Sequence, residues 1–171
     1  TNDTLINSGT ISGTGAYAVA VRFGSGNNTL VVEPGAEFDG VVAGGAGANN
    51  SLVFAGTGGT LTGHSNFYSF QNATIANGAS WTFAGTGTFS YGVTLSNAGL
   101  LTNTGTLFFP ASAFANSGTF QNNGAFTGNI NDTGLVNNSG SIIATLAGET
   151  GHANAIVDRS GTLTSLTNTG V

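Results

Sequence analysis

A short Asn-x-Gly motif recurs along the sequence at intervals that a stack of similar structural units would produce. In the second half the motif comes in pairs, once with Asp132 in place of Asn, and the two glycines of each pair lie six residues apart: Gly99 and Gly105, Gly118 and Gly124, Gly134 and Gly140. The first glycines of successive pairs are separated by nineteen positions and then by sixteen. Self-similarity at a nearly fixed period is the signature of a repeat architecture.

The first half of the chain repeats a different motif. GNNTLVV at residues 26–32 matches ANNSLVF at residues 48–54, an offset of 22. FAGTG at residues 54–58 returns at residues 83–87, an offset of 29. We interpret this longer offset as one coil that contains an inserted loop.

The segments between these motifs alternate apolar and polar residues, as in residues 29–32, 81–83 and 119–121. Such period-2 patterning between Gly and Asn predicts short strands. Asn and Gly are expected to supply the positive φ angles of sharp corners. Short strands also build sandwiches and barrels, but strands that resemble each other at a coil-length period favour a solenoid.

The predicted fold is therefore all-β, a parallel β-helix (β-solenoid) of about eight or nine coils that forms one unit over residues 1–171. Coils stacked at about 4.8 Å each would give a rod on the order of 40 Å long. Inward Leu, Val, Ile and Phe are expected to stack from coil to coil, and Asn at the corners is expected to form amide ladders. The alternation around Trp81 predicts that its ring lies in the core.

Composition excludes several functions. Charged residues make up 5% of the chain, the only strong cations are two arginines, and the formal net charge is −5, so nucleic acid is not an expected partner. The chain has no cysteine for disulfides or thiolate metal sites. No apolar run of about 18 residues is present, so we expect no membrane insertion by this segment.

Residues 64–71 lack the Asn-Gly pattern and are predicted to form a protruding loop. Surface loops are where a regular scaffold usually carries binding. The candidate ligand-contact residues in this loop are His64, Phe67, Tyr68 and Phe70. Exposed aromatic rings there could stack on sugars, so glycans are the candidate ligands.

Catalysis is not expected. Glu33, Glu37 and Asp39 form the only local acid cluster, and the nearest basic residue in sequence is Arg22. Polysaccharide lyases and glycosidases need paired carboxylates or an acid with a basic partner. We interpret the cluster as solvated residues at a turn and strand edge, and we predict no catalytic residues.

No metal or cofactor is expected either. Residues 24–30 faintly resemble a calcium-binding nonapeptide, but Asn28, and Asn50 in the second copy, occupy the position of its aspartate. Calcium prefers anionic oxygen ligands, so this change disfavours binding. His64 and His152 lie 88 residues apart in the sequence, and a zinc site would need two or more further ligands.

The sequence pattern of nearly the whole chain resembles a known family. The segments that carry the resemblance are GNNTLVVEPGAEFDGVV at residues 26–42, NGASWTF at residues 77–83 and units such as INSGTI at residues 6–11. These segments are similar to passenger domains of bacterial autotransporter adhesins and filamentous-haemagglutinin-like proteins. The resemblance implies a right-handed parallel β-helix, secretion through the outer membrane and an extracellular location at the cell surface.

The leading functional expectation is a structural and adhesive segment of such a surface fibre. A self-assembling extracellular filament is the second hypothesis, and a carbohydrate-active enzyme on the same fold is the third. If a second copy followed directly, Gly170 would lie ten residues before the next Gly9, which matches the spacing of Gly124 and Gly134. This predicts one unit of a longer array or filament, with neighbouring copies as end-to-end partners.

Overall fold

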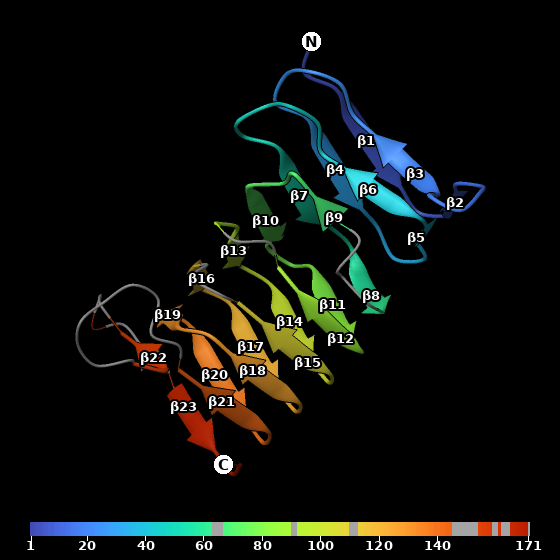
Figure 1. Cartoon of the computed structure of the whole chain (residues 1–171). Helices are drawn as coiled ribbons and strands as arrows, with labels where there is room; N and C mark the ends of the chain where they lie inside the picture. The colour runs from blue at the N-terminus through green and yellow to red at the C-terminus, as the bar shows by residue number, and fades with distance from the viewer. Residues whose placement is uncertain are drawn as a thin grey trace.

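The computed structural model describes residues 1–62, 67–89, 92–109, 113–144, 154–158, 161 and 165–170, and every regular element in these ranges is a β-strand. Successive strands turn around three faces of a coil, and all pairing between coils is parallel (Figure 1). The two ends of the chain lie at opposite ends of the stack (Figure 1). The predicted parallel β-solenoid is confirmed.

The first face is one continuous sheet of eight strands, so the described chain makes eight coils. Its strands are β1 (Thr4–Asn7), β4 (Thr29–Val32), β7 (Ser51–Phe54), β10 (Asn72–Ile75), β13 (Thr94–Asn97), β16 (Ala113–Asn116), β19 (Ile130–Asp132) and β22 (Ile156–Val157). The paired positions show that coil length is not constant. The sequence offset between paired positions is 25 from Thr4 to Thr29, 22 from Thr29 to Ser51, and 16 from Phe114 to Ile130.

The other two faces are each divided into two sheets. The second face consists of β2 (Thr10–Ser12) with β5 (Glu37–Asp39), and then β8 (Thr57–Thr62), β11 (Ser80–Ala84), β14 (Leu100–Asn103), β17 (Thr119–Asn122), β20 (Leu135–Asn138) and β23 (Ser165–Asn168). The third face consists of β3 (Val19–Arg22), β6 (Val41–Ala43) and β9 (Phe67–Tyr68), and then β12 (Thr86–Thr88), β15 (Thr106–Phe108), β18 (Ala125–Thr127) and β21 (Ser141–Ile143).

The register confirms the sequence offsets of 22, 19 and 16, but the repeat of the FAGTG segment was misread. Phe54 pairs with Ile75 on the first face, whereas Phe83 pairs with Leu61 on the second face. The two FAGTG segments therefore occupy different faces and are not equivalent positions of successive coils. They look alike because each ends a strand and enters a corner.

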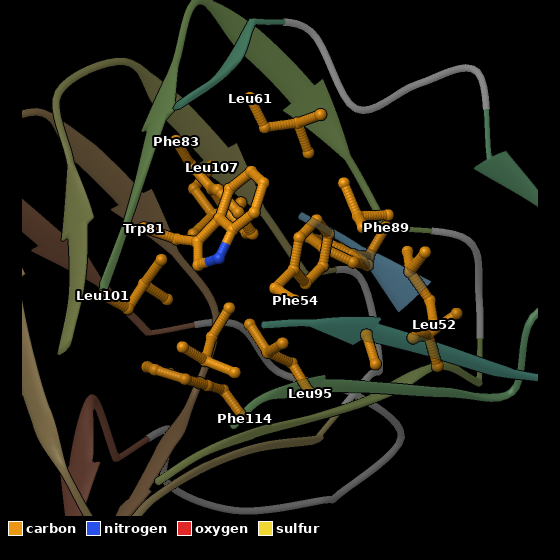
Figure 2. Packing of buried hydrophobic residues seen from close by; sticks show 14 of the residues in the cluster. Leu52, Phe54, Leu61, Trp81, Phe83, Phe89, Leu95, Leu101, Leu107 and Phe114 are labelled. Atoms are coloured by element: carbon orange, nitrogen blue, oxygen red, sulfur yellow. The ribbon is translucent and has the colours of Figure 1, made fainter. Parts of the chain in front are cut away.

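The core fills the interior of the coils with inward side chains that stack along the solenoid axis. One column on the first face runs through Leu30, Leu52, Ala73, Leu95, Phe114 and Ile130, all buried. Figure 2 shows Phe54, Trp81 and Phe83 meeting within this core, and the Phe54 ring lies 5.1 Å from that of Trp81 and 5.2 Å from that of Phe83. Burying each such large side chain contributes about 1.5–3 kcal/mol.

The predicted amide ladders are present at two corners of the second half. At the end of the first face, Asn97 Nδ2 donates to Asn116 Oδ1 over 2.7 Å, and Asn116 Nδ2 donates to Asp132 Oδ1 over 2.6 Å. At the end of the second face, one unbroken ladder links Asn103, Asn122, Asn138 and Asn168, with each Nδ2–Oδ1 distance at 2.7 Å. Because buried polar groups are costly without partners, these ladders satisfy the corner amides from coil to coil.

The glycines of the Asn-x-Gly corners have a different role from the one expected. Positive φ angles occur at corner glycines of the first half, such as Gly35 (φ 90°) and Gly78 (φ 75°), but not at the Asn-x-Gly glycines of the second half. There, a Cβ on Gly118 or Gly124 would overlap the carbonyl oxygen of the glycine one coil earlier. The positive-φ prediction is therefore wrong for these corners, where close stacking of backbones requires glycine.

Candidate binding surface

The segment predicted as a protruding loop is partly built into the solenoid. Phe67 and Tyr68 form β9, which pairs with Val42 and Ala43 of β6. The loop prediction was therefore wrong for these two residues, because backbone pairing holds them to the preceding coil. His64 lies outside the described residues.

The three described aromatic candidates of this segment differ in exposure. Phe70 is 5% exposed and belongs to the core, so its ring is not available at the surface. Phe67 is half-buried, and its ring centroid lies 5.7 Å from that of Phe38 and 6.4 Å from that of Phe70. Tyr68 is 48% exposed. Ligand contact by this segment stays a prediction, and among the described aromatic residues it falls mainly on Tyr68.

The acid cluster lies beside a cleft. Glu37 and Asp39 are exposed on β5, where Thr10 Oγ1 donates to Glu37 Oε2 over 3.3 Å and Ser12 Oγ donates to Asp39 Oδ2 over 2.8 Å. Both carboxylates thus bind hydroxyls of the preceding coil. This arrangement agrees with solvated residues on a strand edge.

The cleft itself forms where the second face divides. β5 and β8 do not pair, although β4 pairs with β7 and β6 pairs with β9 across the same coil boundary. The cleft has a volume of about 260 Å³, and its lining combines Glu37 and Asp39 with the hydroxyls of Thr60 and Thr62 and the ring of Phe67. Acidic, hydroxyl-bearing and aromatic residues suit contact with a polar, hydroxyl-rich ligand such as a sugar.

The sequence analysis did not predict that Phe67 and the acid cluster line the same cleft. The offset of 22 between the two Asn-Asn motifs places residues 37–39 of one coil next to residues 59–61 of the following coil, and this signal could have located the cleft. The interruption of pairing between β5 and β8 leaves no comparable trace in the sequence.

Aromatic residues outside this segment divide between core and surface. Trp81 is 2% exposed, and its Nε1 donates to the carbonyl oxygen of Ala55 over 2.9 Å, which confirms the predicted core position. Tyr17 is 95% exposed and lines a shallow hollow of about 430 Å³ together with Arg22. Tyr91 lies outside the described residues.

The side chains of Asn28 and Asn50 form hydrogen bonds with backbone groups. Asn50 Nδ2 donates to the carbonyl oxygens of Gly45, Gly47 and Ser69, and its Oδ1 accepts the backbone N–H of Asn28 over 2.8 Å. The same pattern repeats at Asn28, so both amides stitch one coil to the next. Within the described residues, no group of three or more His, Cys, Asp or Glu side chains could hold a metal ion.

Comparison with known proteins gave no match to a protein-family model, a curated protein or a solved structure. In the described part of the chain, no helix is long and apolar enough to cross a membrane. The fold and the surface geometry are therefore the basis for inferring function.

Proposed function

We propose that this chain is a structural and adhesive segment of a bacterial fibre that is secreted or displayed at the cell surface, similar to the stalk of an autotransporter passenger. The observation that carries the proposal is the first face, which continues without interruption through eight parallel strands. Seven strand spacings of about 4.8 Å give a rod about 34 Å long. Such a rod projects whatever lies beyond it by a fixed distance, and in this proposal it carries no catalysis.

Two further features support the proposal, one for its structural part and one for its adhesive part. Apolar side chains stack from coil to coil along the axis, and the Asn ladders add direct side-chain bonds between coils of the second half. The exposed Tyr68 and the acid-lined cleft beside the half-buried Phe67 are the adhesive part of the proposal, with glycans as the ligand class.

Immunogold electron microscopy of unpermeabilised cells of the source organism tests this proposal. Antibodies raised against the folded chain are expected to label extended structures outside the cell envelope, and cells that lack the gene should show no label. Label that is confined to the cytoplasm of sectioned cells would contradict the proposal.

Assembly of copies end to end is the second candidate function, and the edges of the terminal coils favour it. Within the described residues, β1 pairs only with β4 and β23 pairs only with β20. All four residues of β23 are exposed, and Ile6 on β1 is 61% exposed. Strand edges of this kind are templates for pairing with another chain.

A proline in β1 provides a selective block. The carbonyl oxygens of Asp3 and Asn7 accept bonds from the next coil, so the alternation of a parallel strand directs the N–H of Ile6 toward the other side. Ile6→Pro thus removes a donor from the outer edge without removing a bond to β4. If copies stack, the natural chain forms filaments at high concentration in electron micrographs, Ile6→Thr forms them too, and Ile6→Pro stays monomeric. A natural chain that remains monodisperse at high concentration would exclude this candidate.

A further inference from the structure

One rung of the ladder at the end of the first face is an acid in place of an amide. Asp132 Oδ1 accepts Asn116 Nδ2 over 2.6 Å and the N–H of Gly134 over 3.2 Å. Asn97 Oδ1 binds the N–H of its own corner glycine in the same way. The Asp132 side chain is 1% exposed, and its Oδ2 has no hydrogen-bond partner among the described residues. This oxygen takes the position that an NH₂ group occupies at the other rungs.

The surroundings of that position are known from the equivalent rungs. Asn116 Nδ2 donates to the carbonyl oxygens of Gly118 over 3.3 Å and Leu135 over 3.2 Å. The register pairs Leu135 with Ser165, so Gly134 and Ser165 stand in the equivalent positions around Asp132. The second carboxylate oxygen of Asp132 is therefore directed toward acceptors, where an amide would find partners for its two hydrogens.

The following rung is acidic as well. β19 and β22 pair Ile130 with Ile156 and Asn131 with Val157, which places Asp158 one coil beyond Asp132. Asp158 Oδ1 accepts the N–H of Gly161, three residues on, over 2.8 Å, whereas Asp132 Oδ1 accepts the N–H two residues on. Two carboxylates thus follow each other at a coil spacing of about 4.8 Å. Asp158 is exposed, so solvent ions can reach this end of the ladder.

We propose that Asp132 and Asp158, together with the carbonyl oxygens of Gly134 and Ser165, bind a hard divalent cation, with Ca²⁺ the best fit. Ca²⁺ takes six to eight oxygen ligands from carboxylates, backbone carbonyls and water at about 2.3–2.6 Å, in flexible geometry. The ligand set contains neither nitrogen nor sulfur, which zinc sites prefer. Only two of the ligands are acidic side chains and the others are backbone oxygens, so the site differs from the clusters of three or more His, Cys, Asp or Glu that the described residues lack.

The cation would join the last coil to the stack. At this corner the cation would have the role that the hydrogen bond from Asn138 to Asn168 has at the neighbouring corner of the same coils. It would also compensate a buried carboxylate oxygen that is otherwise costly to desolvate. This inference does not depend on the proposed function, because it concerns only the local chemistry of the ladder.

Thermal unfolding of the full chain, first stripped with EDTA and then titrated with CaCl₂, tests the site. At a Ca²⁺ concentration 100 times Kd, the ratio of folded to unfolded chain should rise about 100-fold, which corresponds to about 5–10 °C in Tm. Asp132→Asn should abolish this rise. It should also unfold at a higher Tm than the natural chain in EDTA, because asparagine restores the donor of the ladder.

Asp39→Asn is the matched control, since Asp39 is an exposed acid that binds a hydroxyl on the second face, and it should keep the full rise. Asp158→Asn changes an exposed residue and should lose the rise even if Asp132→Asn fails to fold. A natural chain whose Tm does not respond to Ca²⁺, or a response that both the Asp132 and the Asp158 variants retain, would overturn the proposal.

Discussion

Coils two to four, the apolar half, and coils five and six, the amide half, solve the same corner in different ways, and the first coil places Asn7 there. At the end of the first-face strands, coils two to four place Val32, Phe54 and Ile75, which are buried apolar side chains. Coils five and six place Asn97 and Asn116 at the same register position. The apolar corners are followed by glycines with positive φ, whereas the amide corners have stacked glycines with ordinary φ.

This difference shows that stacking fixes the position of a corner but not its chemistry. In the apolar half, the indole N–H of Trp81 satisfies the corner carbonyl oxygen of Ala55. In the amide half, Asn side chains satisfy corner groups of their own coil and of the next. Amide corners are also short: two residues separate β13 from β14 and β16 from β17, whereas four residues separate β4 from β5 and β10 from β11.

The largest effect is expected where the apolar half is most tightly filled. Trp81→Ala should lower the free energy of unfolding by about 3–5 kcal/mol, because it empties a large core volume and leaves the Ala55 carbonyl oxygen without its donor. Chemical denaturation of the purified chain measures this. Tyr17→Ala removes an exposed ring and should change stability by less than about 0.5 kcal/mol. Equal effects of the two variants would show that Trp81 does not lie in the core.

The next effect tests the stacked glycines of the amide half. Gly124→Ala should cost about 3 kcal/mol, since the added Cβ overlaps the carbonyl oxygen of Gly105 and the two coils must separate. Gly9 belongs to the same Asn-x-Gly motif in the first coil, but a Cβ there meets no atom within 4 Å. Gly9→Ala should therefore be tolerated in the isolated chain. If both substitutions are neutral by chemical denaturation, close stacking is not the reason for these glycines.

The smallest of the three effects concerns a single amide. Asn122→Ala should cost about 2 kcal/mol, because Asn103 Nδ2 loses one of its two acceptors and the carbonyl oxygen of Ser141 loses its side-chain donor. Asn123 is exposed, and Asn123→Ala should cost less than about 0.5 kcal/mol.

A double-mutant cycle sharpens this result. The pair Asn103→Ala and Asn122→Ala should together cost about 1 kcal/mol less than the sum of the single variants, because both substitutions break the same Asn103–Asn122 hydrogen bond. Strict additivity would contradict a cooperative ladder.

Much of this fold could be predicted from the sequence, because repeated local chemistry marks equivalent positions. The Asn-x-Gly spacings of 19 and 16 are the register offsets that join Asn97 to Asn116 and Asn116 to Asp132. The acidic rung could be read in the same way, since Asp132 aligns with two asparagines. The alternation at residues 81–83 likewise placed Trp81 in the core.

Other features could not be predicted, because strands on different faces share one local pattern. The two FAGTG segments look equivalent, yet Phe54 lies on the first face and Phe83 on the second. The cleft between β5 and β8 depends on where inter-strand pairing stops, and no residue type marks that point. Phe67 and Tyr68 looked like loop residues because they lack Asn and Gly, but pairing with β6 makes them a strand.

Solution NMR of the folded chain tests the central claim, which is parallel stacking of coils, most directly. Nuclear Overhauser contacts should connect the side-chain amide of Asn122 to those of Asn103 and Asn138, and Phe120 to Leu101 and Val136, at sequence offsets of 19 and 16. Contacts that instead pair successive strands of the sequence in antiparallel fashion, such as β14 with β15, would show a meander or sandwich and would contradict the solenoid.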